Sequence, residues 1–187
     1  MQLVILDRDG VINVDSDDYV KSPAEWIPIP GSLEAIARLH RADWHVIVVT
    51  NQSGIARRLI DLDILVRIHE KMHRSVSEAG GLIDAVFFCP HGPNDNCKCR
   101  KPKPGLFLDI ARRLRINLYG VPAIGDSLHD LQAAQAAGAS PILVKTGKGS
   151  STLNNPEITI DVPVFSSLAG AVDALLVTNP DDNSSNQ

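Results

Sequence analysis

Short apolar segments alternate with amphipathic segments along most of the sequence, and this pattern restricts the fold more than any other feature. The apolar segments are rich in β-branched residues and are expected to be strands, at residues 3–6, 45–49, 83–88, 121–124 and 141–144. Helical spacing of apolar residues marks the other segments, at residues 32–42, 62–76, 104–114, 128–137 and 167–177. Strands that alternate with helices predict a doubly wound, Rossmann-like α/β fold with a parallel sheet between two layers of helices.

The same spacing predicts which side chains of the first two helices pack on the sheet. Residues three or four apart share one helical face, so an apolar stripe is expected to be the buried face. The stripes are Leu33, Ile36, Ala37 and His40 in the first helix, and Leu62, Leu65, Val66, His69, Met72 and Val76 in the second.

Length and composition are typical of a single globular domain. Residues 1–178 are expected to form that domain, and the polar, aperiodic residues 179–187 are expected to be a disordered tail. A net charge of −4 and an aromatic content of 4% argue against nucleic acid as a partner. No apolar run is long enough to span a bilayer, and the first residues lack the basic start of a signal peptide. We therefore expect a cytoplasmic monomer that binds neither nucleic acid nor membrane.

Polar clusters follow three of the expected strands. They lie at residues 7–13 (Asp-Arg-Asp-Gly-Val-Ile-Asn), 50–54 (Thr-Asn-Gln-Ser-Gly) and 125–130 (Gly-Asp-Ser-Leu-His-Asp). In a doubly wound sheet the ligand site lies beyond the carboxyl ends of the strands, so we expect these clusters to share one site. Carboxylates that lie close together repel one another unless a cation sits among them, and hard oxygen ligands select Mg²⁺. Each aspartate taken singly could instead cap a helix or form a turn, but that alternative does not explain two acids flanking Arg8.

Four motifs in this order resemble the haloacid dehalogenase-like phosphohydrolase superfamily. They are Asp-x-Asp-Gly at 7–10, Thr50-Asn51, Lys101 and Gly-Asp-x-x-x-Asp at 125–130. The resemblance implies that Asp7 attacks the substrate phosphorus and forms an aspartyl-phosphate. It also implies that Asp9 protonates the leaving alkoxide and later deprotonates the hydrolytic water.

The resemblance also implies a catalytic metal and a set of phosphoryl ligands. Mg²⁺ would be held by the carboxylate of Asp7, the main-chain carbonyl of Asp9 and the carboxylate of Asp126. Thr50 and Lys101 would hold the phosphoryl oxygens. Asp130 would orient the lysine or a metal-bound water.

The three cysteines of the sequence lie within eleven positions of one another and have a histidine among them. Cys89, His91, Cys97 and Cys99 offer three thiolates and one imidazole, which is a closed ligand set for a structural, tetrahedral Zn²⁺. The alternative is that the four residues meet by chance on a mobile loop. Because Arg100 and Lys101 follow the last of these ligands, a bound zinc would hold both side chains over the phosphate site.

A second metal pattern is present at residues 69–73. His69-Glu70-Lys71-Met72-His73 spells H-E-x-x-H, the zinc metalloprotease signature. Such a site needs a third ligand and a cleft that faces the helix, whereas His69 falls on the stripe expected to pack on the sheet. A protease is therefore the alternative function from a different class, and we do not favour it.

Within the superfamily, the cysteine segment and the motif Cys-Arg-Lys-Pro-x-Pro-Gly at 99–105 make the sequence similar to the D-glycero-D-manno-heptose 1,7-bisphosphate 7-phosphatases. The histidinol-phosphate phosphatase domain shares the zinc loop and is the alternative, but it is commonly fused to a dehydratase. The resemblance implies a small phosphorylated sugar as substrate and a step toward activated heptose for lipopolysaccharide core or related glycans.

The resemblance further implies a substrate-binding set around the phosphate site. Arg100 would recognise the substrate, and residues 15–19 would line the sugar site. The residue after Asp126 is often lysine in the heptose enzymes, so Ser127 leaves the anomer preference open. The expected substrate-binding residues are Asp15, Ser16, Asp17, Asp18, Tyr19, Asn51, Gln52, Ser53, Arg100 and Ser127.

Overall fold

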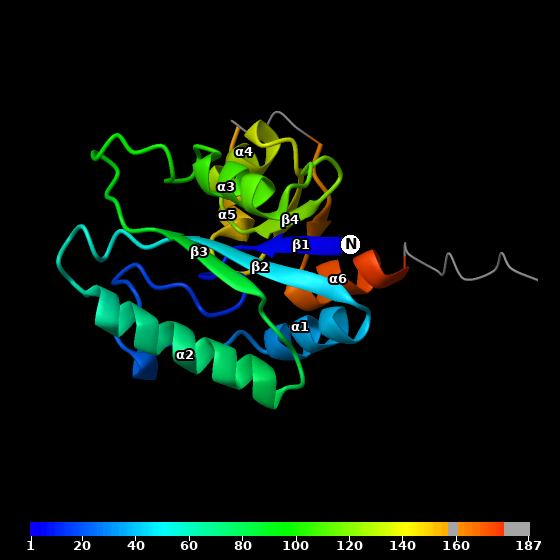
Figure 1. Cartoon of the computed structure of the whole chain (residues 1–187), viewed down its shortest axis with the longest axis horizontal. Coiled ribbons are helices and arrows are strands. Elements are labelled where there is room, and N and C mark those ends of the chain that lie inside the picture. Colours follow the sequence, from blue (N-terminus) through cyan, green and yellow to red (C-terminus); the bar gives the residue numbers. More distant parts are fainter. Residues whose placement is uncertain (157–160, 178–187) are drawn as a thin grey trace, which may run out of the picture.

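The computed structural model describes residues 1–156 and 161–177 and contains one parallel, six-stranded sheet. The strand order is β3-β2-β1-β4-β5-β6, and all neighbouring strands run parallel (Figure 1). The strands are β1 (Gln2–Leu6), β2 (Trp44–Asn51), β3 (Ala85–Cys89), β4 (Pro122–Gly125), β5 (Ser140–Val144) and β6 (Val164–Phe165).

Helices cover both faces of this sheet because its central strands are apolar on both sides. In β1, Leu3 and Ile5 enter one buried cluster, whereas Val4 and Leu6 enter the other. The layer below the sheet in Figure 1 holds α1 (Ser32–Arg41), α2 (Leu62–Glu78) and α6 (Leu168–Val177), and the layer above it holds α3 (Gly105–Leu114) and α4 (Leu128–Ala136). Among the described residues, no helix has the length and apolar character needed to cross a membrane.

The observed architecture confirms the α/β fold predicted from the alternating pattern. All five expected strands and all five expected helices are present, and their ends differ from the expected ones by at most two residues. Three short elements were not predicted, namely the 3₁₀ turn η1 (Pro23–Glu25), helix α5 (Gly149–Leu153) and strand β6. They are too short for a periodic apolar pattern. The expected tail at 179–187 lies outside the described residues.

The face of α2 that packs inward differs from the predicted stripe. Leu65, Ile68, Met72 and Val76 are the buried residues of this helix. Leu62 is 53% exposed and Val66 is 52% exposed, so their predicted burial was wrong. Each residue turns a helix by about 100°, which places these two side chains on the flank of the true stripe. In α1, His40 is likewise exposed, and Leu39 is buried in its place.

The strand order creates a switch point beside β1. The chain runs outward from β1 through β2 to β3 and then returns to β4 on the other side of β1. Leu6, the last residue of β1, is level with Ile124, the next-to-last residue of β4. The residues that follow these two strands, Asp7 and Asp126, therefore emerge side by side at the position where doubly wound sheets bind ligands.

The burial difference within α2 predicts a difference in stability. Replacing the fully buried Ile68 by alanine is expected to lower the free energy of unfolding by about 2–5 kcal/mol, because it removes apolar contacts and leaves a cavity. Val66→Ala on the same helix is the matched control and should change it by less than about 0.5 kcal/mol. Urea unfolding followed by circular dichroism measures the free energy of unfolding of both variants. Equal losses of stability would contradict the burial of Ile68 and the exposure of Val66.

Candidate active site

A cavity of about 580 Å³ opens at the carboxyl ends of the central strands. It gathers the polar clusters that follow β1, β2 and β4, together with the segment after β5. All the expected catalytic, magnesium-binding and substrate-binding residues line it except Asp18, whose side chain is exposed outside the cavity. The structure thus brings these residues together, and their individual roles toward a substrate stay predictions.

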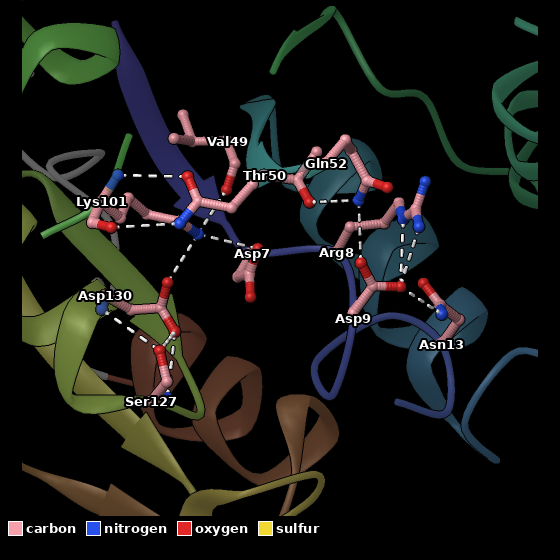
Figure 2. A network of polar contacts seen from close by, with 11 residues as sticks. Asp7, Arg8, Asp9, Asn13, Val49, Thr50, Gln52, Lys101, Ser127 and Asp130 are labelled. Atoms are coloured by element: carbon pink, nitrogen blue, oxygen red, sulfur yellow. Dashed lines mark hydrogen bonds and ion pairs between the residues drawn. The ribbon is translucent and has the colours of Figure 1, made fainter. Parts of the chain in front are cut away.

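The ammonium group of Lys101 lies at the centre of the site and is almost entirely buried. Its Nζ lies 2.8 Å from Oδ1 of Asp7, 2.5 Å from Oδ1 of Asp130 and 2.8 Å from the carbonyl oxygen of Val49 (Figure 2). Burial disfavours the charged amine, but the carboxylates of Asp130 and Asp7 outweigh this effect and raise the pKa of Lys101. Lys101 is therefore a fixed positive charge beside Asp7.

Asn51, at the end of β2, positions this lysine. Its side-chain amide donates to the carbonyl oxygen of Lys101 and accepts from the Lys101 backbone N–H, both at 3.1 Å. The two hydrogen bonds hold the backbone of Lys101 on either side of its Cα atom. Asn51 was expected to bind substrate, and in this structure both ends of its amide contact the Lys101 backbone.

Asp9 lies in a separate cluster of donors to the right of Asp7 in Figure 2. Its Oδ1 accepts hydrogen bonds from Nη2 of Arg8 and from Nδ2 of Asn13, both at 2.9 Å, and its Oδ2 accepts from Nε2 of Gln52 at 2.9 Å. Burial opposes ionisation, but the Arg8 guanidinium and these hydrogen bonds hold the pKa of Asp9 below its usual value. The carboxylate form of Asp9 is therefore favoured in the resting site.

Two glycines allow the backbone to wrap around the carboxylate of Asp126. Its Oδ2 accepts a 2.7 Å hydrogen bond from the backbone N–H of Lys148. Gly10 and Gly147 both have positive φ, and a Cβ atom on either would lie 2.1 Å from this oxygen. The loops after β1 and β5 can approach Asp126 only because side chains are absent at these two positions.

Three carboxylates share the centre of the site with one ammonium. Oxygens of Asp7, Asp126 and Asp130 lie within 4.8 Å of one another. Burial and the carboxylate of Asp130 raise the pKa of Asp7 to about 7, and burial and the carboxylate of Asp7 raise the pKa of Asp126 to about 8. A divalent cation among the oxygens would balance this excess of negative charge, so the donor set fits Mg²⁺.

Asp130 and Ser127 form the amino-terminal cap of α4. The hydroxyl of Ser127 donates to Oδ2 of Asp130 at 2.6 Å, and the Ser127 backbone N–H donates to the same oxygen at 3.0 Å. Since the other oxygen of Asp130 contacts Lys101, both are occupied by protein groups. Asp130 therefore contacts Lys101 through one oxygen and Ser127 through the other, as expected of a residue predicted to orient the lysine.

The cysteine segment forms a compact cluster next to the cavity. Sγ of Cys89 lies 3.7 Å from Sγ of Cys97 and 3.2 Å from Sγ of Cys99, and Nδ1 of His91 lies 3.2 Å from Sγ of Cys99. The three cysteines form no disulfide. A tetrahedral zinc site with Zn–S bonds of about 2.3 Å places its sulfurs about 3.8 Å apart. The cluster is therefore compatible with a zinc site.

The H-E-x-x-H pattern does not form a metal site in the described part of the chain. Neither histidine belongs to the two groups of metal-ligating side chains found there. Nε2 of His69 lies 3.3 Å from the positively charged Nη1 of Arg8, and His73 is exposed. A cation next to Arg8 would be repelled, so this geometry argues against the metalloprotease alternative.

Two family models match the chain. One is described as polynucleotide kinase 3 phosphatase and matches residues 2–126, and the other is described as HAD-hydrolase-like and matches residues 98–171. Both descriptions agree with the superfamily resemblance in the catalytic motifs.

Curated relatives match nearly the whole chain. The D-glycero-β-D-manno-heptose-1,7-bisphosphate 7-phosphatase of Bordetella bronchiseptica is 57% identical over 176 residues, which cover 94% of this chain and 98% of the relative. The protein of the same name from Pseudomonas aeruginosa is 52% identical, over 93% of this chain and 97% of the relative. The chain belongs to this phosphatase family. It is therefore a haloacid dehalogenase-like phosphoric monoester hydrolase.

A crystal structure of a relative has the same fold as this phosphatase. The D,D-heptose 1,7-bisphosphate phosphatase of B. bronchiseptica, complexed with magnesium and phosphate, has a TM-score of 0.94 to the chain at 56% identity. The match covers 96% of this chain and 100% of that one. The magnesium in that complex supports Mg²⁺ as the ion that fits the carboxylates here.

Lys148 is a residue of the phosphatase site that the sequence analysis missed. Its Nζ lies 3.2 Å from Oδ2 of Asp15, so it joins the segment after β5 to the loop that carries residues 15–19. Burial opposes the charge of Lys148, but the carboxylate of Asp15 outweighs it and raises the lysine pKa. The sequence carries a signal for it, because Lys148 follows the fifth expected strand much as the polar clusters follow the other strands.

Gly10 is expected to be important for catalysis, because a Cβ atom added at this position would collide with Asp126. We expect Gly10→Ala to lower kcat/KM for p-nitrophenyl phosphate by about 100-fold, since small misplacements of reacting groups have effects of that size. Gly120→Ala is the control, because Gly120 has a similar positive φ (+77° against +81°) with nothing within 4 Å. Comparable losses of activity in both variants would contradict the predicted collision with Asp126.

Proposed function

We propose that this phosphatase removes the C7 phosphate of D-glycero-β-D-manno-heptose 1,7-bisphosphate and leaves the C1 phosphate in place. The proposal is carried by the identity of 57% with a relative of that name, over 98% of the relative's length. The β anomer is proposed because the curated relatives are named for it. The complete set of catalytic motifs around one cavity supports the same activity.

The reaction uses Asp7 as the nucleophile. Its carboxylate attacks the phosphorus of the C7 phosphate, and the ester bond to the sugar breaks as the aspartyl-phosphate forms. Lys101 and Thr50 bind the phosphoryl oxygens while charge moves onto the leaving oxygen. Mg²⁺ held by Asp7, the main-chain carbonyl of Asp9 and Asp126 would shield the negative charges that approach one another.

Asp9 transfers the protons in both halves of this reaction. The negative charge of a bound phosphate raises the pKa of a nearby carboxylate, which allows Asp9 to carry the proton that the leaving alkoxide takes. Asp9 is then a carboxylate, the form that its hydrogen-bond donors favour, and it accepts a proton from the water that hydrolyses the aspartyl-phosphate. The proton given up in the first half is thereby regained in the second.

Substitution of the two aspartates tests this assignment. Asp7→Asn is expected to abolish turnover, because an amide cannot form the acyl phosphate. Asp9→Asn keeps the main-chain carbonyl but loses proton transfer, which is usually worth about 10²–10⁴-fold. Steady-state rates with heptose bisphosphate measure both variants, and near wild-type turnover by Asp7→Asn would refute the covalent mechanism.

The choice of the C7 phosphate is attributed to the shape of the substrate. C7 is a primary, extended arm that can reach Asp7 inside the cavity, whereas the ring and its C1 phosphate remain nearer the rim. Arg100 lines the cavity and donates a 3.3 Å hydrogen bond to the carbonyl oxygen of His91. Its planar guanidinium is suited to gripping the non-reacting phosphate through two parallel hydrogen bonds.

A ³¹P NMR time course tests the substrate assignment. We expect the C7 resonance to disappear while the C1 resonance persists. Arg100→Ala should lower kcat/KM for the bisphosphate at least about tenfold, or about 1.4 kcal/mol, more than for p-nitrophenyl phosphate. Arg112→Ala, on the exposed side of α3, is the control. Release of the C1 phosphate, or a higher kcat/KM for histidinol phosphate, would contradict the proposal.

The cysteine cluster is assigned a structural Zn²⁺ that keeps Arg100 and Lys101 in place. We expect one zinc per chain in reduced protein, and Cys97→Ser is expected to lose the metal and most of the activity although Cys97 touches no reacting atom. Lys98→Ser, between two of the cysteines, is the matched control and should keep both. Inductively coupled plasma mass spectrometry measures the metal, and zinc-free wild-type protein with full activity would refute the assignment.

The retained C1 phosphate indicates the use of the product. A sugar 1-phosphate is the substrate that a nucleotidyltransferase needs to form a nucleotide-activated sugar. We assign heptose 1-phosphate to that step, on the way to the lipopolysaccharide core. Cytoplasmic location and a monomeric state stay predictions alongside it.

A further inference from the structure

Arg8 is a buried arginine between the two catalytic aspartates, and its side chain is 1% exposed. Its Nε and Nη2 donate to Oδ1 of Asp9 at 3.2 and 2.9 Å (Figure 2). Its Nη1 makes no hydrogen bond to Asp9 and lies 3.3 Å from Nε2 of His69 in α2. One planar group thus connects the predicted acid/base residue to a histidine that the mechanism does not use.

The chemistry of arginine determines the protonation state and the tautomer of His69. A guanidinium can only donate hydrogen bonds, so the facing Nε2 must accept, and the imidazole must be neutral with its proton on Nδ1. Burial lowers the pKa of His69 to about 4, and the charges of Arg8 and His73 act in the same direction, against the opposing effect of Asp9. The ring of Phe88 packs edge-on against the imidazole, with centroids 6.2 Å apart.

We propose that His69 is a positioning residue that holds Arg8 in the orientation in which Arg8 aligns the Asp9 carboxylate for proton transfer. The inference rests on the proposed phosphatase mechanism. It also gives His69 a role other than metal binding, namely that of a hydrogen-bond acceptor, and the exposed His73 has no part in it.

The contacts of Arg8 show why the hydrogen-bond acceptor on His69 matters for the alignment of Asp9. Oδ1 of Asp9 receives two of its hydrogen bonds from Arg8, whose remaining edge is held by His69. Without a hydrogen-bond acceptor at position 69, the buried Nη1–H of Arg8 loses its partner. Rotation of the guanidinium toward another acceptor then becomes favourable. Such a turn withdraws Nε and Nη2 from Oδ1 and leaves Asp9 held by Asn13 and Gln52 alone.

Leaving groups of different basicity separate positioning from a general loss of structure. The alkoxide of a primary alcohol needs the proton of Asp9, whereas p-nitrophenolate leaves without one. Since kcat/KM reports the steps up to transfer of the phosphoryl group to Asp7, a misaligned Asp9 lowers kcat/KM for alkyl esters far more than for the aryl ester. A merely structural defect lowers both alike.

The experiment compares His69→Leu, His69→Gln and His73→Leu in the full chain. Heptose 1,7-bisphosphate, glycerol 1-phosphate and p-nitrophenyl phosphate are the substrates, and the thermal midpoint is measured for each protein. We expect His69→Leu to lower kcat/KM for the alkyl esters by about 10–100-fold, as for other residues that orient a catalytic group, with a much smaller change for the aryl ester. His69→Gln offers an amide oxygen to Arg8 and should restore most of the alkyl activity, and His73→Leu should match wild type.

Equal losses on alkyl and aryl esters, or an unchanged alkyl rate in His69→Leu, would overturn the inference. Failure of His69→Gln to recover more activity than His69→Leu, at a similar thermal midpoint, would also overturn it. The proposed function fails separately, if wild-type enzyme hydrolyses glycerol 1-phosphate better than heptose bisphosphate. The comparison of glycerol 1-phosphate with p-nitrophenyl phosphate then still decides the role of His69.

Discussion

The ion pairs of one buried ammonium hold the catalytic end of the sheet together. Lys101 contacts Asp7 after β1, the carbonyl oxygen of Val49 in β2 and Asp130 in α4. A buried charge is costly unless its hydrogen bonds are complete, and here each of three acceptors comes from a different element. The segment that carries Lys101 has no helix or strand of its own. Its backbone is held at Lys101 by two hydrogen bonds with the side-chain amide of Asn51.

The arrangement of charge gives two neighbouring aspartates different properties. Asp7 shares one ammonium with Asp130 and lies near Asp126, so its surroundings are short of positive charge. Asp9, two residues later, accepts hydrogen bonds from one guanidinium and two side-chain amides. A cation is therefore favoured at Asp7, and a stable carboxylate is favoured at Asp9. This division supports a nucleophile in one position and a proton carrier in the other.

The sequence was sufficient to predict the parts of the site that follow from short-range patterns. Asp7 and Asp126 follow apolar strands, and the three cysteines lie within eleven positions of one another, so the clustering of each set could be predicted. The inward face of α2 was misjudged at Val66, because an apolar side chain on the flank of a helix looks the same in sequence as one in the core. The contacts of His69 with Arg8 and of Lys148 with Asp15 join residues far apart in the chain, and local spacing carries no information about them.

We expect substrate specificity to depend on how the loops around the cavity are held. Between β1 and β2 the chain forms only η1 and α1, so the loop with residues 15–19 has no folded domain above it. Lys148 fixes that loop through Asp15, and its backbone N–H also binds Asp126. Arg100 is fixed on the other side through the carbonyl oxygen of His91 in the cysteine segment. Because each wall is tied to a predicted metal-binding group, we expect a change in the position of either wall to be transmitted to the site.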